Sequence, residues 1–188
     1  MSKSYPRDLA QLRQAAQRRE WNTLQDTLKQ LFTQIEPLSA LGIAITRAQA
    51  FWPTFAAYYP DAGWVRELLD LIIATTAPNQ LPLEALTEFP EPGCGNFLMA
   101  VFDLARAVDP QFTLAECYGH ITSAVANAIL ADLQHTYYNQ HRDEYSLLFD
   151  PGAAAQVQQS FWLDRTVANR DTAIWLEIAD AVEAILPG

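Results

Sequence analysis

Hydrophobic side chains recur every three or four residues along most of this chain, and this spacing is its strongest constraint on the fold. Within residues 113–140, Ile121, Val125, Ile129 and Leu133 follow one another at intervals of four, which places them on one face of an α-helix. No run alternates hydrophobic and polar residues over the length of a strand, and only 7 glycines are available for tight β-turns. The sequence therefore predicts an all-α fold.

Start and stop signals divide the chain into about seven helices. The longest is expected over residues 113–140, where Thr113 and Glu116 have the spacing of a capping box. A helix over 97–108 is hydrophobic nearly all round, so it should pack with the long helix at the centre of a bundle. The 188 residues contain no repeat and no low-complexity linker, which predicts a single domain spanning residues 1–188.

The N-terminal segment carries two hydrophobic stripes that lie on different helix faces. The first ends near Ala16, and the second runs from Trp21 to Ile35. Either two helices meet near Arg19–Asn22, or one helix contacts different neighbours along its length. Because no glycine or proline marks a stop, the sequence favours one continuous helix over residues 8–35.

Charge is distributed unevenly along this acidic chain, whose net charge is -10. Residues 1–30 contain six basic and three acidic groups, and the remainder contains 6 basic and 19 acidic groups. The acidic body repels phosphate, so nucleic-acid binding is not expected. The basic arm, residues 1–20, is expected to pack less firmly. Its Arg13, Arg18 and Arg19 are candidate partner-binding residues that could dock on the chain's own acidic body, a second copy or an acidic partner.

Targeting signals and membrane spans are absent from the sequence. The N-terminus lacks the apolar centre of a signal peptide, and no apolar run reaches the ~20 residues of a membrane span. Cys94 and Cys117 form neither a disulfide framework nor a metal-binding motif. The predicted location is the cytoplasm, with no membrane contact.

Two carboxylate–imidazole pairs are the candidates for metal or acid–base chemistry. Glu116 and His120 are four residues apart, and Asp132 and His135 are three apart, so each pair can share a helix face. The two histidines, however, are separated by about 22 Å along a helix, too far to bind one ion. The sequence also lacks nucleotide-binding and catalytic motifs, and we predict no metal and no cofactor.

Aromatic residues are frequent enough to line a ligand pocket. A pocket between residues 39–76 and the long helix is one hypothesis, with candidate ligand-binding residues Trp52, Tyr59, Glu116, Tyr118 and His120. The Tyr58–Tyr59 and Tyr137–Tyr138 pairs cannot both point inward from one helix face, so one member of each is expected at the surface.

Two functional hypotheses follow. The leading one is a non-enzymatic intracellular interaction or assembly protein that binds a protein partner or forms a homo-oligomer. The alternative is a helical small-ligand-binding or enzyme domain whose pocket is lined by aromatic residues and Glu116/His120. Because no catalytic motif is present, the sequence favours the non-enzymatic hypothesis.

Overall fold

The computed structural model describes residues 5–186, and 76% of this part of the chain is helical with no strand. The all-α prediction is confirmed. This region contains ten α-helices and one 3-10 helix. The helix count exceeds the predicted seven because the first helix is divided and several helices are only six or seven residues long. None of these helices combines the length and apolar character needed to cross a bilayer.

In chain order the elements are α1 (Tyr5–Arg18), α2 (Trp21–Phe32), α3 (Pro37–Gln49), α4 (Trp52–Tyr58), α5 (Gly63–Ile73), the 3-10 helix η1 (Leu83–Thr87), α6 (Cys94–Ala107), α7 (Leu114–Tyr138), α8 (Arg142–Leu147), α9 (Ala154–Leu163) and α10 (Arg165–Ile185).

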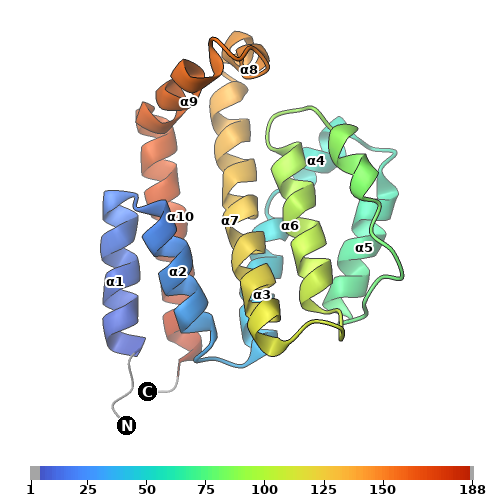
Figure 1. Ribbon diagram of the computed structural model, residues 1–188, viewed down its shortest axis with the longest axis vertical. Coiled ribbons are helices and arrows are strands. Elements are labelled where there is room, and N and C mark those ends of the chain that lie inside the picture. The colour runs from blue at the N-terminus through green and yellow to red at the C-terminus, as the bar shows by residue number, and fades with distance from the viewer. Residues whose placement is uncertain (1–4, 187–188) are drawn as a thin grey trace.

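The long helix α7 runs through the middle of the molecule (Figure 1). It packs most extensively on the antiparallel α6, and it also contacts α2, α3 and α10. Helices α1, α2 and α10 lie on one side of α7, and α4 and α5 lie beyond α6 on the other. The prediction that α6 and α7 form the centre of the bundle is therefore confirmed.

The start of α7 follows from its capping residues. The Thr113 hydroxyl accepts a hydrogen bond from the Glu116 backbone N–H, and the Glu116 carboxylate accepts one from the Thr113 N–H at 2.7 Å. This reciprocal pair is the predicted capping box. Ile129, in the middle of the predicted hydrophobic face, is fully buried.

The prediction of one continuous helix over residues 8–35 is wrong. Helix α1 ends at Arg18 and α2 begins at Trp21. Between them Arg19 has a φ of 57°, and the Glu20 N–H donates to the Ala15 carbonyl at 3.0 Å. This is a Schellman-type helix end with arginine in the left-handed position that glycine usually takes.

The expectation of a less firmly packed N-terminal arm is also wrong for its described part. Helix α1 packs against both α2 and α10. It buries Leu9, Leu12, Ala15 and Ala16 in the core. Residues 1–4 lie outside the described residues.

The C-terminal end of α7 differs from the expectation for its tyrosine pair, because Tyr137 and Tyr138 are both buried. Helix α9 folds over this end, and its Phe161 ring stacks on Tyr138 at 5.7 Å and meets Tyr137 edge-on at 5.4 Å. Helix α9 therefore covers the face of α7 that would be exposed to solvent if α7 were isolated. Tyr58 and Tyr59, by contrast, are both half-buried.

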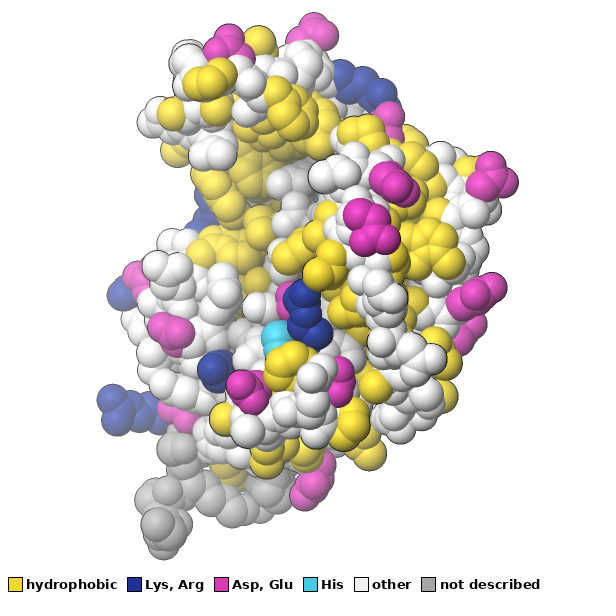
Figure 2. Space-filling model, turned by 45° about the vertical axis from the view of Figure 1, so that its right-hand side comes forward, with side chains coloured by type: hydrophobic (Ala, Val, Ile, Leu, Met, Phe, Trp, Pro, Cys, Tyr) yellow, Lys and Arg dark blue, Asp and Glu magenta, His cyan; other side chains and the backbone are white. Residues whose placement is uncertain are grey.

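The surface near α8 and α9 is rich in exposed hydrophobic side chains. Leu147, Phe149 and Leu163 lie at this end of the molecule, and Phe149 is 77% exposed. Figure 2 shows a hollow lined with hydrophobic side chains just below this end. The shape of this face arises because α8 and α9 project beyond the top of α2 (Figure 1).

Candidate functional site

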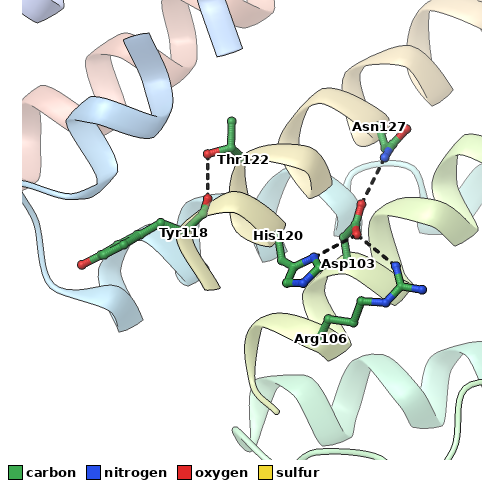
Figure 3. Close-up of polar contacts among 6 residues, drawn as sticks. All are labelled: Asp103, Arg106, Tyr118, His120, Thr122 and Asn127. Atoms are coloured by element: carbon green, nitrogen blue, oxygen red, sulfur yellow. Dashed lines mark hydrogen bonds and ion pairs between the residues drawn. The ribbon is translucent and has the colours of Figure 1, made fainter. Parts of the chain in front are cut away.

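A buried carboxylate lies between the two central helices. Asp103 of α6 is only 6% exposed. Its Oδ1 accepts a hydrogen bond from Arg106 Nη1 at 3.3 Å and lies 3.4 Å from His120 Nδ1 (Figure 3). Its Oδ2 accepts a hydrogen bond from Asn127 Nδ2 at 3.2 Å. The carboxylate is thus satisfied by groups from both helices, as buried charges generally are.

The arrangement around His120 limits its chemistry. Asp103 on one side and the ring of Phe112, 4.9 Å away, hold the imidazole in place. An aspartate–histidine pair of this kind can move a proton when a reacting group meets the other ring nitrogen. Within residues 5–186, however, no hydroxyl or thiol hydrogen-bonds to His120. The contacts that exist join α6 to α7, which makes this cluster a structural connection between the central helices.

Glu116 and His120 do border a common hollow of about 400 Å³. Its other wall is α2, which contributes Lys29 among other residues, so the predicted location between residues 39–76 and the long helix is wrong. The Glu116 carboxylate is held by hydrogen bonds from Thr113, which lower its pKa. Its role at the helix start leaves it little freedom to bind a ligand.

The remaining predicted ligand-binding residues lie elsewhere. Tyr118 is buried, and its hydroxyl donates a hydrogen bond to the Ile35 carbonyl at 2.9 Å. Trp52 and Tyr59 lie on and next to α4, where both rings pack on Phe55 at 6.0 and 5.4 Å. None of these three residues lines the hollow beside Glu116, so the five candidates do not form one site.

Two of the three candidate partner-binding arginines contact α10 of the same chain. Arg13 Nη2 lies 2.6 Å from Asp180 and 2.6 Å from Glu183. Arg19 Nε lies 3.5 Å from Asp171. Arg18 lies 3.9 Å from its neighbour Glu20. The basic arm therefore docks on the chain's own acidic helix, the first of the three options considered above.

Asp171 is a buried carboxylate that was not among the candidates predicted from the sequence. It is fully buried, and its Oδ2 accepts a hydrogen bond from Trp21 Nε1 at 3.3 Å in addition to the Arg19 contact. Burial raises its pKa. Its position in the sequence could have identified it, because Asp171 is three residues before Ile174 and four before Trp175. This spacing places a carboxylate on the buried face of α10.

Helix α3 carries an exposed hydrophobic surface that faces α5. We call it the α3–α5 face, and it borders a hollow of about 500 Å³ lined by Leu38, Leu41, Gly42, Ile45, Thr46, Gln49, Ile73 and Thr75. Leu38 is 68% exposed and Ile73 is 46% exposed. Large aliphatic side chains that share one exposed surface are typical of interaction sites.

A second hollow lies between α3 and α10, and it shares Gly42 and Thr46 with the first. This α3–α10 groove has a volume of about 570 Å³ and is lined by Ser39, Gly42, Ile43, Thr46, Arg47, Ala50, Glu177, Ile178, Ala181 and Ile185. Its walls are mainly aliphatic, with two charged residues, Arg47 and Glu177. A mostly apolar cleft with few polar groups is the usual form of a small-ligand site.

The side chain of Arg47 is only 14% exposed, yet no oxygen in the described part of the chain accepts a hydrogen bond from it. Its Nη2 lies 3.8 Å from Asp132 Oδ1, beyond hydrogen-bonding distance. Both oxygens of Asp132 instead accept hydrogen bonds from Arg170, at 2.7 Å for Nη2 to Oδ1. Arg47 thus keeps only a long ion pair with Asp132, and its buried Nε has no hydrogen-bond partner in the described part of the chain.

No protein-family model, curated protein or solved structure matches this chain. Within residues 5–186, no three His, Cys, Asp or Glu side chains gather closely enough to bind a metal ion.

Proposed function

We propose that this protein is a non-enzymatic assembly protein that pairs with a second copy of itself through the α3–α5 face. The observation that supports this proposal most directly is the exposure of Leu38 and Ile73 on one surface. Burying both side chains against a partner would remove them from water, which is the main driving force of association.

The charge pattern favours a second copy as the occupant of this face. Two chains of net charge -10 repel each other over most of their surfaces. Helix α3, in contrast, contains one charged residue, Arg47, and residues 71–77 at the end of α5 contain none. The α3–α5 face is therefore a surface on which two acidic chains can meet with little direct repulsion.

The shape of α3 also suits a two-fold pairing. Gly42 and Thr46 are one helical turn apart on its outer side, and no atom lies within 4 Å of the space where a Gly42 side chain would project. Such small residues allow two helices to approach closely, and an antiparallel pair centred here would place Leu38 of each copy near Gln49 of the other. An interface of standard size buries about 800 Å² per partner, less than a tenth of the 9832 Å² surface.

Sedimentation equilibrium over a wide range of protein concentrations tests the proposal. We expect a monomer–dimer equilibrium that Leu38→Glu abolishes, because the new carboxylate would be buried twice in a symmetric interface. Leu114→Glu is the matched control, since Leu114 is 58% exposed on α7 and lies outside the face. Added salt should strengthen the dimer by screening the repulsion of the two acidic bodies.

This function would be refuted if the protein stayed monomeric at the highest concentrations. It would also be refuted if Leu38→Glu and Leu114→Glu dimerised equally well. The alternative function, binding of a small ligand, is supported by a different feature, the Arg47 guanidinium in the α3–α10 groove, which makes no hydrogen bond within the described residues. Cytoplasmic location stays a prediction of the sequence.

A further inference from the structure

We propose that the α3–α10 groove binds an aliphatic monocarboxylate, such as a fatty acid of about ten carbons, with the carboxylate on Arg47 and the chain along the groove. This inference does not rest on the proposed dimer, although Gly42 and Thr46 border both the α3–α5 face and this groove. It depends on three features of the groove: an unsatisfied cation, aliphatic walls, and a length that suits a short acyl chain.

The unsatisfied cation is the first feature. A guanidinium that is shielded from water without hydrogen-bond partners is unfavourable, so such groups are normally paired. Arg47 lines both the α3–α10 groove and the adjoining hollow of about 480 Å³ that contains Arg170 and Thr136. Arg47 therefore borders the groove, and none of its donors is used in a hydrogen bond within the described residues.

The chain's own carboxylates do not fill this role. Asp132 is occupied by Arg170, whose Nε and Nη2 bind its two oxygens. Glu177 lines the same groove, but no ion pair joins it to Arg47 in the described part of the chain. The contact of Arg47 with these carboxylates is limited to the 3.8 Å ion pair with Asp132, so its guanidinium can still bind a ligand carboxylate, which matches its planar fork through two parallel hydrogen bonds.

The aliphatic walls of the groove determine which chemical group the ligand carries beside its carboxylate. Ile43 and Ala50 on α3 face Ile178, Ala181 and Ile185 on α10. These side chains offer an alkyl chain a dry surface but no hydrogen-bond donor or acceptor. The polar side chains of the lining are limited to Ser39, Thr46, Arg47 and Glu177, too few to satisfy the many polar groups of a sugar or nucleotide, whereas a hydrocarbon chain needs none.

The charge of the site limits the head group to a single negative charge. Arg47 and Arg170 supply two positive charges, and Asp132 and Glu177 supply two negative charges around the same place. A phosphate dianion would add more negative charge than this balanced site attracts. A monocarboxylate needs only the Arg47 guanidinium, which makes no hydrogen bond in the described part of the chain.

The length of the groove sets the length of the chain. Along α3 the lining extends from Arg47 to Ser39, eight residues, which is about 12 Å at the rise of an α-helix. With carbon–carbon bonds of about 1.5 Å, an extended chain of roughly ten carbons covers this distance. Decanoate is therefore the natural probe, and acetate, which keeps the head group without the chain, is the first control.

Isothermal titration calorimetry with decanoate, decanol and acetate tests the inference on the intact protein below the concentrations at which decanoate forms micelles. We expect saturable binding of one decanoate per chain and at least tenfold weaker binding of decanol and acetate. Arg47→Met should weaken decanoate binding at least tenfold and leave decanol binding unchanged. Arg66→Met is the matched control, because Arg66 is an exposed arginine on α5 paired with Asp70.

Folding of the variants is checked by their thermal melts, and Arg47→Lys provides a second test if the methionine variant is unstable. Lysine keeps the charge but loses the two-pronged hydrogen bond, so decanoate should bind it with intermediate affinity. Equal affinities for decanoate and decanol, no binding of decanoate at all, or unchanged binding by both Arg47 variants would overturn the proposal. None of these three results tests the dimer, because sedimentation of Arg47→Met measures association separately.

Discussion

At Gly93, just before α6, the backbone approaches α7 so closely that no side chain fits. It precedes α6 with a φ of 85°, and a Cβ atom built on it would lie 2.1 Å from the Ala131 carbonyl oxygen of α7 and 2.9 Å from the Ala131 carbonyl carbon. Both contacts are with backbone atoms, which cannot rotate away as a flexible side chain would. We therefore expect Gly93→Ala to push the start of α6 away from α7.

The magnitude follows from two separate costs. An alanine in the left-handed conformation costs about 1–2 kcal/mol relative to glycine. Forcing additional volume into well-packed structure typically costs about 1–3 kcal/mol more. The free energy of unfolding should thus fall by about 2–5 kcal/mol, a large part of the 5–15 kcal/mol that holds an ordinary domain together. For a protein of this size, the melting temperature should fall by roughly 4–20 °C.

Urea unfolding followed by circular dichroism measures this change directly. Gly95→Ala is the matched control, because Gly95 lies two residues later in α6 and no atom is found within 4 Å of its missing side chain. That variant should be as stable as the parent or up to about 1 kcal/mol more stable, since alanine favours a helix over glycine. If Gly93→Ala and Gly95→Ala unfold at the same urea concentration, the close approach of α6 and α7 at Gly93 is wrong.

Two further predictions concern buried polar groups. Asp103→Asn removes the charge that Arg106 and His120 share, and it should lower the free energy of unfolding by about 1.5–3 kcal/mol in a urea titration; an unchanged midpoint would show that the cluster does not join the central helices. Burial lowers the pKa of His135, so the fold favours its neutral form, and this contribution to stability is present above pH 6.5 and is lost as the pH falls through the lowered pKa. His135→Gln should therefore lose less stability than the parent between pH 7.5 and pH 5, and parallel losses in the two proteins would contradict this sign.

Local signals in the sequence determined most of the secondary structure. The i,i+4 spacing from Ile121 to Leu133 predicted the central helix, because a helix presents such residues on one face whatever surrounds it. Thr113 and Glu116 predicted where that helix begins, because a capping box involves only residues within one turn. These features depend on neighbours along the chain, and the sequence shows those neighbours directly.

Only the tertiary structure decided what the helices bring together. The helix end at Arg19 lacks the usual glycine, and the residue is held by Asp171 and lies over the Trp162 ring, both more than 140 positions away. The burial of both tyrosines at 137 and 138 required α9 to fold over them. Arg47 likewise keeps only a long ion pair, because Asp132 accepts its hydrogen bonds from Arg170, 38 residues further along the chain. Contacts of this kind depend on how distant helices pack. Helical periodicity shows which face of each helix is buried, but it does not show which other helix packs against that face.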